Sequence, residues 1–256
     1  MSTFQRWQNL DGKVAVITGA IGQVGYATSI RLAKAGCKVI GIVRSNVDEA
    51  VKKYQMLPNQ HLGHFIIEAD ITNTATLKPA AEEVSEKAGK IDILVNSAGI
   101  SSSVKPDDIQ SLTDELFDSI IISNLRGPFS VIREFISLIK KSQDGIIINI
   151  SSTSGQRASA SNLAYGASKA GLDLLTKSLA KVIAPEVRIV SVVPGHMVTP
   201  TSGATKGPAA NDKMAAATPL KRIGYADDIA STVEALCTHI RFATGSVFLV
   251  DGGRTL

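Results

Sequence analysis

The stretch VAVITGAIGQVG, Val14 to Gly25, decides the fold of this chain. Its apolar start, VAVIT, predicts a buried strand, and glycines follow at positions 19, 22 and 25. Glycine lets the backbone turn tightly and approach a phosphate, and helical apolar spacing begins at Tyr26. The stretch therefore predicts a strand, a phosphate-cradling turn and a helix, an order typical of dinucleotide-binding proteins.

The rest of the chain repeats this alternation of strand and helix. Six further short apolar runs predict buried strands: 38–43, 64–69, 91–96, 145–150, 187–193 and 246–250. Helical spacing fills the segments 26–35, 47–56, 75–88, 114–140, 164–184 and 227–239. We therefore expect an α/β protein with three layers, a doubly wound parallel seven-stranded sheet of the Rossmann type.

No linker or internal repeat divides the chain, so we expect a single domain over residues 1–256. The stretch from Thr201 to Thr218 is small, polar and loosely patterned. Such segments often cover a ligand cleft, and we expect a substrate lid at about 196–218.

Composition excludes several classes of protein. The net charge is +4, but the basic residues are scattered, so no nucleic-acid-binding surface is expected. The first residues lack an apolar core of signal-peptide length, and no 18 uncharged apolar residues run together, so we expect neither export nor a membrane span. Cys37 and Cys237 are far apart and predict neither a disulfide nor a metal site, which suits the reducing cytoplasm. His61, His64 and Glu68 could suggest a metal site, but solvated histidines are the better interpretation, and no metal is expected.

The residues after the second predicted strand bear on the choice of cofactor. A carboxylate there would bind the ribose hydroxyls of NAD, whereas an arginine suits the 2′-phosphate of NADP. The sequence has Arg44 and no carboxylate before Asp48. We therefore predict NADP, with NAD as the alternative if Arg44 only points into solvent.

Tyr165 and Lys169 form the candidate catalytic pair. They are four residues apart in a predicted helix, so both side chains project from one face. Ser152 ends the fifth predicted strand and should lie at the same edge of the sheet as the glycine turn. Asn124 sits inside a predicted helix, where asparagine is disfavoured, either for a functional reason or as a local bend beside Gly127.

In their order and spacing, these motifs resemble the short-chain dehydrogenase/reductase family, in its compact branch of about 250 residues. The resemblance covers essentially the whole chain. It rests on the following signposts: the turn from Thr18 to Gly25, Asp70, the sequence NSAG at 96–99, Asn124, Ser152, Tyr165 with Lys169, Pro194-Gly195 followed by Thr199, and the terminal VDGG at 250–253.

The resemblance implies the roles of individual residues. The catalytic residues would be Asn124, Ser152, Tyr165 and Lys169. The cofactor-binding residues would be Gly19, Ile21, Gly22, Gln23, Val24, Gly25, Arg44, Asp70, Ile71, Asn96, Ala98, Gly99, Tyr165, Lys169, Pro194, Gly195 and Thr199. Two residues depart from the family pattern, since Gln23 replaces the usual middle glycine of the turn and Ser97 replaces a second asparagine.

The expected activity is hydride transfer between NAD(P)(H) and a small carbonyl or alcohol substrate. The reaction would interconvert a ketone, with the 3-oxoacyl type as the favoured candidate, and a secondary alcohol, with Tyr165 as general acid or base. Lys169 and the oxidised nicotinamide would lower the pKa of the Tyr165 phenol. The resemblance further implies a homo-oligomer, a tetramer or dimer, built through helices 114–140 and 164–184. A catalytically silent cofactor-binding regulator and a lyase or epimerase on the same fold are the alternatives.

Overall fold

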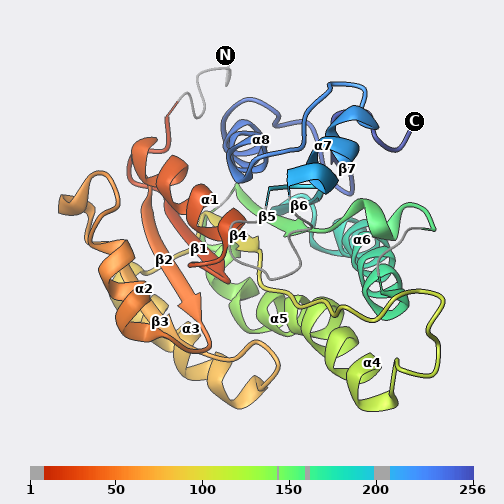
Figure 1. The fold of residues 1–256 in the computed structure, drawn as a ribbon. Coiled ribbons are helices and arrows are strands. Elements are labelled where there is room, and N and C mark those ends of the chain that lie inside the picture. The colour runs from red at the N-terminus through yellow and green to blue at the C-terminus, as the bar shows by residue number, and fades with distance from the viewer. Residues whose placement is uncertain (1–8, 143, 159–161, 199–207) are drawn as a thin grey trace.

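The computed structural model describes residues 9–142, 144–158, 162–198 and 208–256. At its centre is one parallel sheet with the strand order β3-β2-β1-β4-β5-β6-β7 (Figure 1). This order confirms the predicted doubly wound seven-stranded sheet. The strands are β1 (Val14–Thr18), β2 (Lys38–Val43), β3 (Phe65–Glu68), β4 (Ile93–Asn96), β5 (Gly145–Ile150), β6 (Val187–Pro194) and β7 (Val247–Val250).

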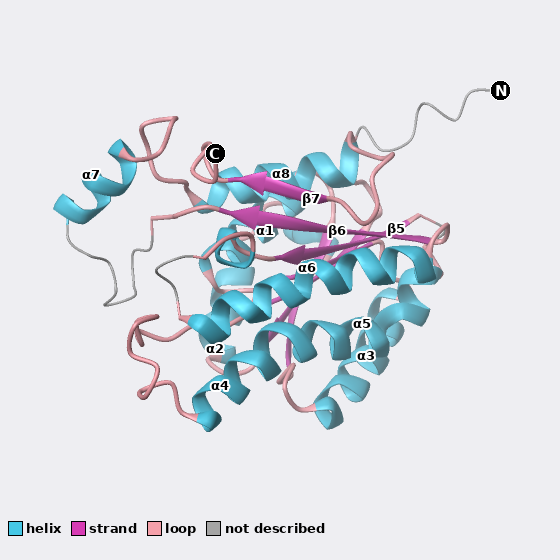
Figure 2. Ribbon diagram, turned by 90° about the vertical axis from the view of Figure 1, so that its right-hand side faces the viewer, coloured by secondary structure: helices cyan, strands magenta, loops and turns pink. Residues whose placement is uncertain are grey.

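Helices cover both faces of the sheet and bury two separate apolar layers. Successive strand residues point to opposite faces, so Ala15 and Ile17 belong to one layer and Val14 and Val16 to the other. The first layer packs under α1 (Gln23–Lys34), α2 (Val47–Tyr54) and α8 (Ala226–Thr238). The second packs under α3 (Thr74–Ala88), α5 (Gly127–Lys140) and α6 (Leu163–Ile183). Figure 2 shows α5 and α6 on one side of the strands and α8 on the other.

The parallel arrangement brings the carboxyl ends of all strands to one edge, where such folds bind ligands. Polar side chains lie at or next to the last positions of neighbouring strands there: Thr18 of β1 pairs in register with Asn96 of β4, which pairs with Asn149 of β5. The arrowheads of β6 and β7 point toward this edge in Figure 2, where α7 (Pro208–Ala216) and the loop into α4 (Asp114–Ile121) also lie. The functional residues of the site come from this edge.

Most elements lie within two residues of their predicted bounds, and three helical segments differ by more. Helix α1 begins at Gln23, because glycines at its start carry no apolar signal. The predicted helix 114–140 is divided into α4, a π-helical turn (η2, Ile122–Arg126) and α5. A π turn widens the helix by one residue without changing the apolar pattern on either side. Helix α7 was not predicted, because its small residues form no apolar stripe.

Of the predicted lid at 196–218, residues 199–207 lie outside the described part of the chain, and residues 208–216 form α7. Two shorter 3₁₀ turns complete the description, η1 (Gln60–Leu62) and η3 (Thr153–Gly155). Among the described residues, no helix is both long enough and apolar enough to cross a membrane.

Candidate active site

The turn between β1 and α1 is built so tightly that two positions require glycine. Gly19 has φ +64°, and a Cβ there would lie 2.8 Å from the Cα of Ala98. A Cβ on Gly25 would collide with the carbonyl oxygen of Gly19. The turn therefore packs directly on the segment after β4, and a side chain at either position would force the two apart.

The first turn of α1 is open to an anion. Its N-cap, Gly22, offers no side-chain cap, and no acidic residue lies in the first turn. The backbone N–H groups of a helix start carry partial positive charge, and here no side chain neutralises it. The residues present therefore fit the pyrophosphate of a dinucleotide.

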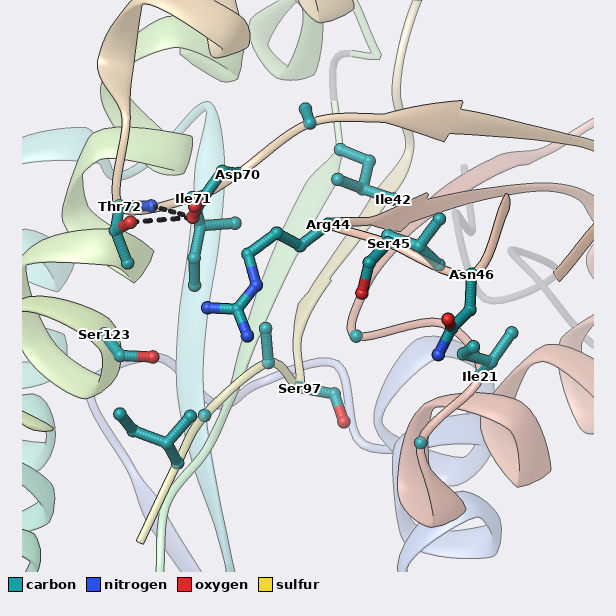
Figure 3. Close-up of a pocket in the computed structure, with 17 residues that line it drawn as sticks. Ile21, Ile42, Arg44, Ser45, Asn46, Asp70, Ile71, Thr72, Ser97 and Ser123 are labelled. Carbon is teal, nitrogen blue, oxygen red and sulfur yellow. Dashed lines mark hydrogen bonds between the residues drawn. The ribbon is translucent and has the colours of Figure 1, made fainter. Parts of the chain in front are cut away.

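A first cavity, of about 260 Å³, opens between the glycine turn and the ends of β2, β3 and β4. Figure 3 shows that the side chain of Arg44 extends from the end of β2 into this space, between Ile71 and Ser97. Asp70 lies at the far side, where its carboxylate accepts hydrogen bonds from the backbone N–H and the hydroxyl of Thr72, at 2.8 and 2.7 Å (Figure 3). The predicted cofactor residues Gly19, Ile21, Gly22, Arg44, Asp70, Ile71, Ala98 and Gly99 all line this cavity.

Arg44 is the cation of this cavity. Its side chain is exposed and makes no ion pair or hydrogen bond with any described residue. Asp70, the carboxylate that lines the same cavity, instead accepts a hydrogen bond from the Thr72 hydroxyl. Ser45 follows Arg44 and adds a hydroxyl to the lining. A guanidinium with free donors beside a hydroxyl is the chemistry that a phosphate monoester needs.

A second cavity, of about 350 Å³, holds the predicted catalytic residues. Ser152, Tyr165 and Lys169 line it together with Gly195 and Gln23. Gly22, Ser97, Gly99 and Ile100 line both cavities, so the two are parts of one cleft that meet at the glycine turn. The cleft thus has a basic end at Arg44 and a catalytic end at Tyr165.

The start of α6 fixes the orientation of the catalytic pair. Asn162 caps the helix: its side-chain oxygen accepts a hydrogen bond from the backbone N–H of Tyr165 at 3.1 Å. One turn later, Lys169 is 5% exposed, and its Nζ donates to the carbonyl oxygen of Ile150 at 2.8 Å. The same Nζ lies 5.7 Å from the centre of the Tyr165 ring. Both side chains therefore face the end of β5, as their spacing in the helix predicts.

The titration of this pair differs from the expectation. Burial raises the pKa of Tyr165 above its usual 10, and the hydrogen bond with the Ser152 hydroxyl only partly opposes the shift. Burial also lowers the pKa of Lys169, from the usual 10.5 to about 8, against the attraction of Asp173. Desolvation thus shifts both groups toward their neutral forms, and the lowering of the Tyr165 pKa by Lys169 together with an oxidised nicotinamide stays a prediction.

Asn124 lies in the π-helical turn η2 and is fully buried. Its side-chain oxygen accepts from the N–H of Ile100, and its amide nitrogen donates to the carbonyl of Ile100, both at 2.8 Å. The amide nitrogen also donates to the Ser168 hydroxyl. The Asn124 side chain therefore holds Ile100, a residue of the cleft wall, in place. The neighbouring Gly99 packs closely on it, since a Cβ on Gly99 would lie 3.0 Å from the Asn124 oxygen.

Two predicted cofactor residues, Asn96 and Gly25, do not line either cavity, and a third lies outside the described part of the chain. Asn96, expected in the lining, is 2% exposed inside β4, and its amide donates to the Asn149 side chain at 2.9 Å. The reason is its place within the strand, because the chain reaches the cleft only after β4 ends, at Ser97. Gly25 packs behind the turn on Gly19. Thr199 lies outside the described residues. The remaining predicted residues Gln23, Val24, Pro194 and Gly195 line the catalytic cavity.

Sequence reasoning missed several residues of the site. Asn162 and Ser102 are joined by a hydrogen bond of 3.0 Å that ties the loop after β4 to the start of α6. An asparagine directly before a helical segment is a capping signal, which could have pointed to Asn162. Nothing in the sequence pairs it with Ser102, sixty positions earlier.

The candidate metal residues have other tasks. The Nδ1 atom of His64 accepts from the backbone N–H of Val39 at 2.9 Å, and its Nε2 lies 2.8 Å from the carbonyl oxygen of Pro58. Within the described ranges, no group of three or more His, Cys, Asp or Glu side chains is arranged to hold a metal ion.

Known proteins that are similar to this chain are reductases. The family model described as enoyl-(acyl carrier protein) reductase matches residues 19–255. The 3-oxoacyl-[acyl-carrier-protein] reductase FabG of Thermotoga maritima is 33% identical over 95% of this chain and 98% of its own. This chain belongs to the short-chain dehydrogenase/reductase family. It is therefore an NAD(P)-dependent oxidoreductase acting on the C=O or CH–OH group of a small molecule.

Other members of the family are similar over nearly their whole length. An acetoacetyl-CoA reductase of Cupriavidus necator is 30% identical over 94% of this chain and 97% of its own. Among solved structures, that of gox2181 has a TM-score of 0.87 at 32% identity and covers 96% of this chain and 97% of that one. The RhlG/NADP active-site complex of Pseudomonas aeruginosa has a TM-score of 0.89 at 27% identity, covering 97% and 98%.

Proposed function

We propose that this oxidoreductase uses NADPH to reduce a ketone, of the 3-oxoacyl thioester type, to the secondary alcohol. The observation that carries the proposal is the cleft itself, which has Arg44 at one end and Ser152, Tyr165 and Lys169 at the other. When bound, the cofactor supplies a hydride to the carbonyl carbon. The carbonyl oxygen then needs a proton and a hydrogen-bond donor, which this chain must provide.

Tyr165 is the proton donor in this proposal. Because burial raises the pKa of its phenol, the hydroxyl stays protonated at neutral pH and is ready to donate. The alcohol forms as the hydride reaches carbon and the Tyr165 proton reaches oxygen. The resulting phenolate is stabilised by the charge of a bound oxidised nicotinamide and by Lys169.

Ser152 and Lys169 orient the reactants. The Ser152 hydroxyl, which lines the same cavity as Tyr165, points the substrate oxygen at the proton donor. Lys169 holds the ribose hydroxyls of the nicotinamide half, a role that its buried ammonium can fill by exchanging its bond with Ile150. Asn124 contributes by fixing Ile100 in the wall of the cleft.

Arg44 supports NADP rather than NAD. Its guanidinium is unpaired with described residues and faces the cavity at the end of β2, where the 2′-phosphate would lie. A relative, RhlG, forms a complex with NADP.

The 3-oxoacyl class of substrate is supported by the relatives. Two of them are named as a 3-oxoacyl-[acyl-carrier-protein] reductase and an acetoacetyl-CoA reductase. The family model's own description names an enoyl reductase, so an enoyl thioester belongs in the same test.

The test is oxidation of NADPH by the purified chain with acetoacetyl-CoA, a 2-enoyl-CoA or a simple ketone, with Tyr165→Phe as the control. We expect consumption of NADPH with acetoacetyl-CoA and formation of the 3-hydroxy product. Consumption with the enoyl thioester alone would overturn the ketone proposal. Binding of NADPH without any turnover would favour a silent regulator, and product without net NADPH consumption would favour a lyase or epimerase.

We further propose a homo-oligomer of single-domain chains, located in the cytoplasm. Helices α4, α5 and α6 carry exposed apolar side chains, namely Phe117, Phe129, Leu163, Leu174 and Val182. Burying them against a second copy would remove them from water. Sedimentation of the wild type should show a dimer or tetramer, and a monomer at all concentrations would contradict this.

A further inference from the structure

Gln23, the first residue of α1, lines the catalytic cavity and carries a side-chain amide. We propose that this side chain binds the phosphate on the nicotinamide side of the dinucleotide, and so contributes to cofactor affinity in addition to the backbone of the turn. The inference rests on the proposed function, because it requires that the cleft hold a dinucleotide. It assigns to a single side chain a task that the glycine turn alone does not perform.

The first step of the argument is the position of Gln23 along the cleft. Gly22 and Gly99 line both cavities and therefore mark where they join. A dinucleotide with its adenine near Arg44 and its nicotinamide near Tyr165 must pass its pyrophosphate over this join. Gln23 lines only the catalytic cavity, whereas Ile21 lines only the other. Gln23 therefore lies on the nicotinamide side of the pyrophosphate.

The second step is that the turn tolerates a side chain here. The positions closed to a Cβ are Gly19, which faces Ala98, and Gly25, which faces Gly19. Gln23 lies between them in sequence, but this residue is half-buried, carries a full side chain and lines the catalytic cavity. The backbone bond from the Gly22 N–H to the Gly19 carbonyl, at 3.0 Å, closes the turn as a tight loop. The glutamine thus adds a polar group without opening the turn.

The third step is chemical. Within the described ranges, the Gln23 amide has no hydrogen-bond partner, although it lies beside the uncapped first turn of α1. An amide N–H donates well to a phosphate oxygen, and hydrogen bonds to charged acceptors are stronger than neutral ones. The helix start attracts the same anion through its backbone N–H groups, so both donors act on one phosphate.

Isothermal titration of the full chain tests the proposal with three probes: NADPH, reduced nicotinamide mononucleotide, and adenosine 2′,5′-bisphosphate. Gln23→Ala and Gln23→Gly should weaken NADPH and the mononucleotide about tenfold, the loss of one hydrogen bond to a charged group. Both should leave the adenosine bisphosphate within about twofold. Gln23→Glu should weaken NADPH further, because its carboxylate repels the phosphate.

Several outcomes would overturn the inference. Equal or tighter binding of NADPH by Gln23→Gly would mean that the side chain only obstructs the cleft. Equal losses for NADPH and the adenosine bisphosphate would mean that Gln23 shapes the turn instead. Thermal unfolding without ligand checks that each variant folds. Failure of the wild type to bind any dinucleotide would refute the proposed function itself, whereas unchanged binding by the variants of an active wild type would refute only the role of Gln23.

Discussion

The side-chain oxygen of Asn162 holds the backbone N–H of Tyr165 at 3.1 Å, three residues along the chain. Its amide nitrogen donates to the Ser102 hydroxyl at 3.0 Å. One buried asparagine therefore joins the helix that carries the proposed proton donor to the loop that walls the cleft.

Asn162→Ala should lower the free energy of unfolding by about 1 kcal/mol, because the helix loses its cap. It should also lower kcat more than it changes KM, because Tyr165 loses its fixed position. Asn162→Ser keeps a capping oxygen and should recover most of the stability but not the link to Ser102. Asn73→Ala is the matched control, since Asn73 caps α3 and lines neither cavity. If both alanine variants affect kcat equally, the positioning role of Asn162 is wrong.

Tyr165→Phe should reduce kcat by roughly 10²- to 10⁴-fold, the usual contribution of a positioned general acid. NADPH affinity should change little, because the variant removes one hydroxyl and almost no volume. Titration of cofactor fluorescence measures the affinity, and steady-state kinetics measure kcat. Tyr26→Phe serves as the control, because the Tyr26 hydroxyl donates to the Lys53 carbonyl outside both cavities. Turnover near the wild-type rate in Tyr165→Phe would refute its assignment.

Lys169→Met should stabilise the cofactor-free protein while abolishing turnover. The pKa of Lys169 falls from 10.5 to about 8 on folding, so below about pH 8 the folded state carries a buried charge that the unfolded state keeps in water. Removing that charge should gain roughly 1 to 3 kcal/mol at pH 7.

The contribution of Lys169 to stability depends on pH in a definite direction. Between about pH 8 and 10.5 the unfolded chain binds more protons at Lys169 than the folded chain, so wild-type stability rises with pH from this group. The advantage of Lys169→Met in urea unfolding should therefore shrink between pH 8 and 10. A constant or growing advantage would show that the methionine acts through packing.

Arg44→Ser should weaken NADPH binding by about 10- to 100-fold and leave NADH binding nearly unchanged, because only NADPH carries the 2′-phosphate. The ratio of the two dissociation constants measures the effect directly. Arg133→Ser is a suitable control, since Arg133 pairs with Glu134 on the surface of α5. Equal losses for both cofactors would place Arg44 elsewhere on the nucleotide.

The sheet and the catalytic pair could be predicted from the sequence because their signals are local. The run VAVIT and the spacing of Tyr165 and Lys169 each reveal their geometry within a few residues. The contacts of Asn124 and Asn162 join segments 24 and 60 positions apart, and no local pattern reports such pairs. The π turn at Asn124 is likewise invisible, because the apolar stripe continues through it.

The titration of Tyr165 could not be predicted because it depends on burial. The sequence shows that an amine is near the phenol, but not that both groups are withdrawn from water. Desolvation raises the pKa of Tyr165 and lowers that of Lys169, and the burial that causes both shifts appears only in three dimensions.

Asn124 holds Ile100, and Asn162 holds Ser102, through hydrogen bonds that join only parts of this chain. The scaffold around the proton donor therefore needs no ligand to hold it together, and its ordering entropy is spent during folding. Oxidised cofactor can therefore be exchanged for reduced cofactor while Tyr165 keeps its position for the next turnover.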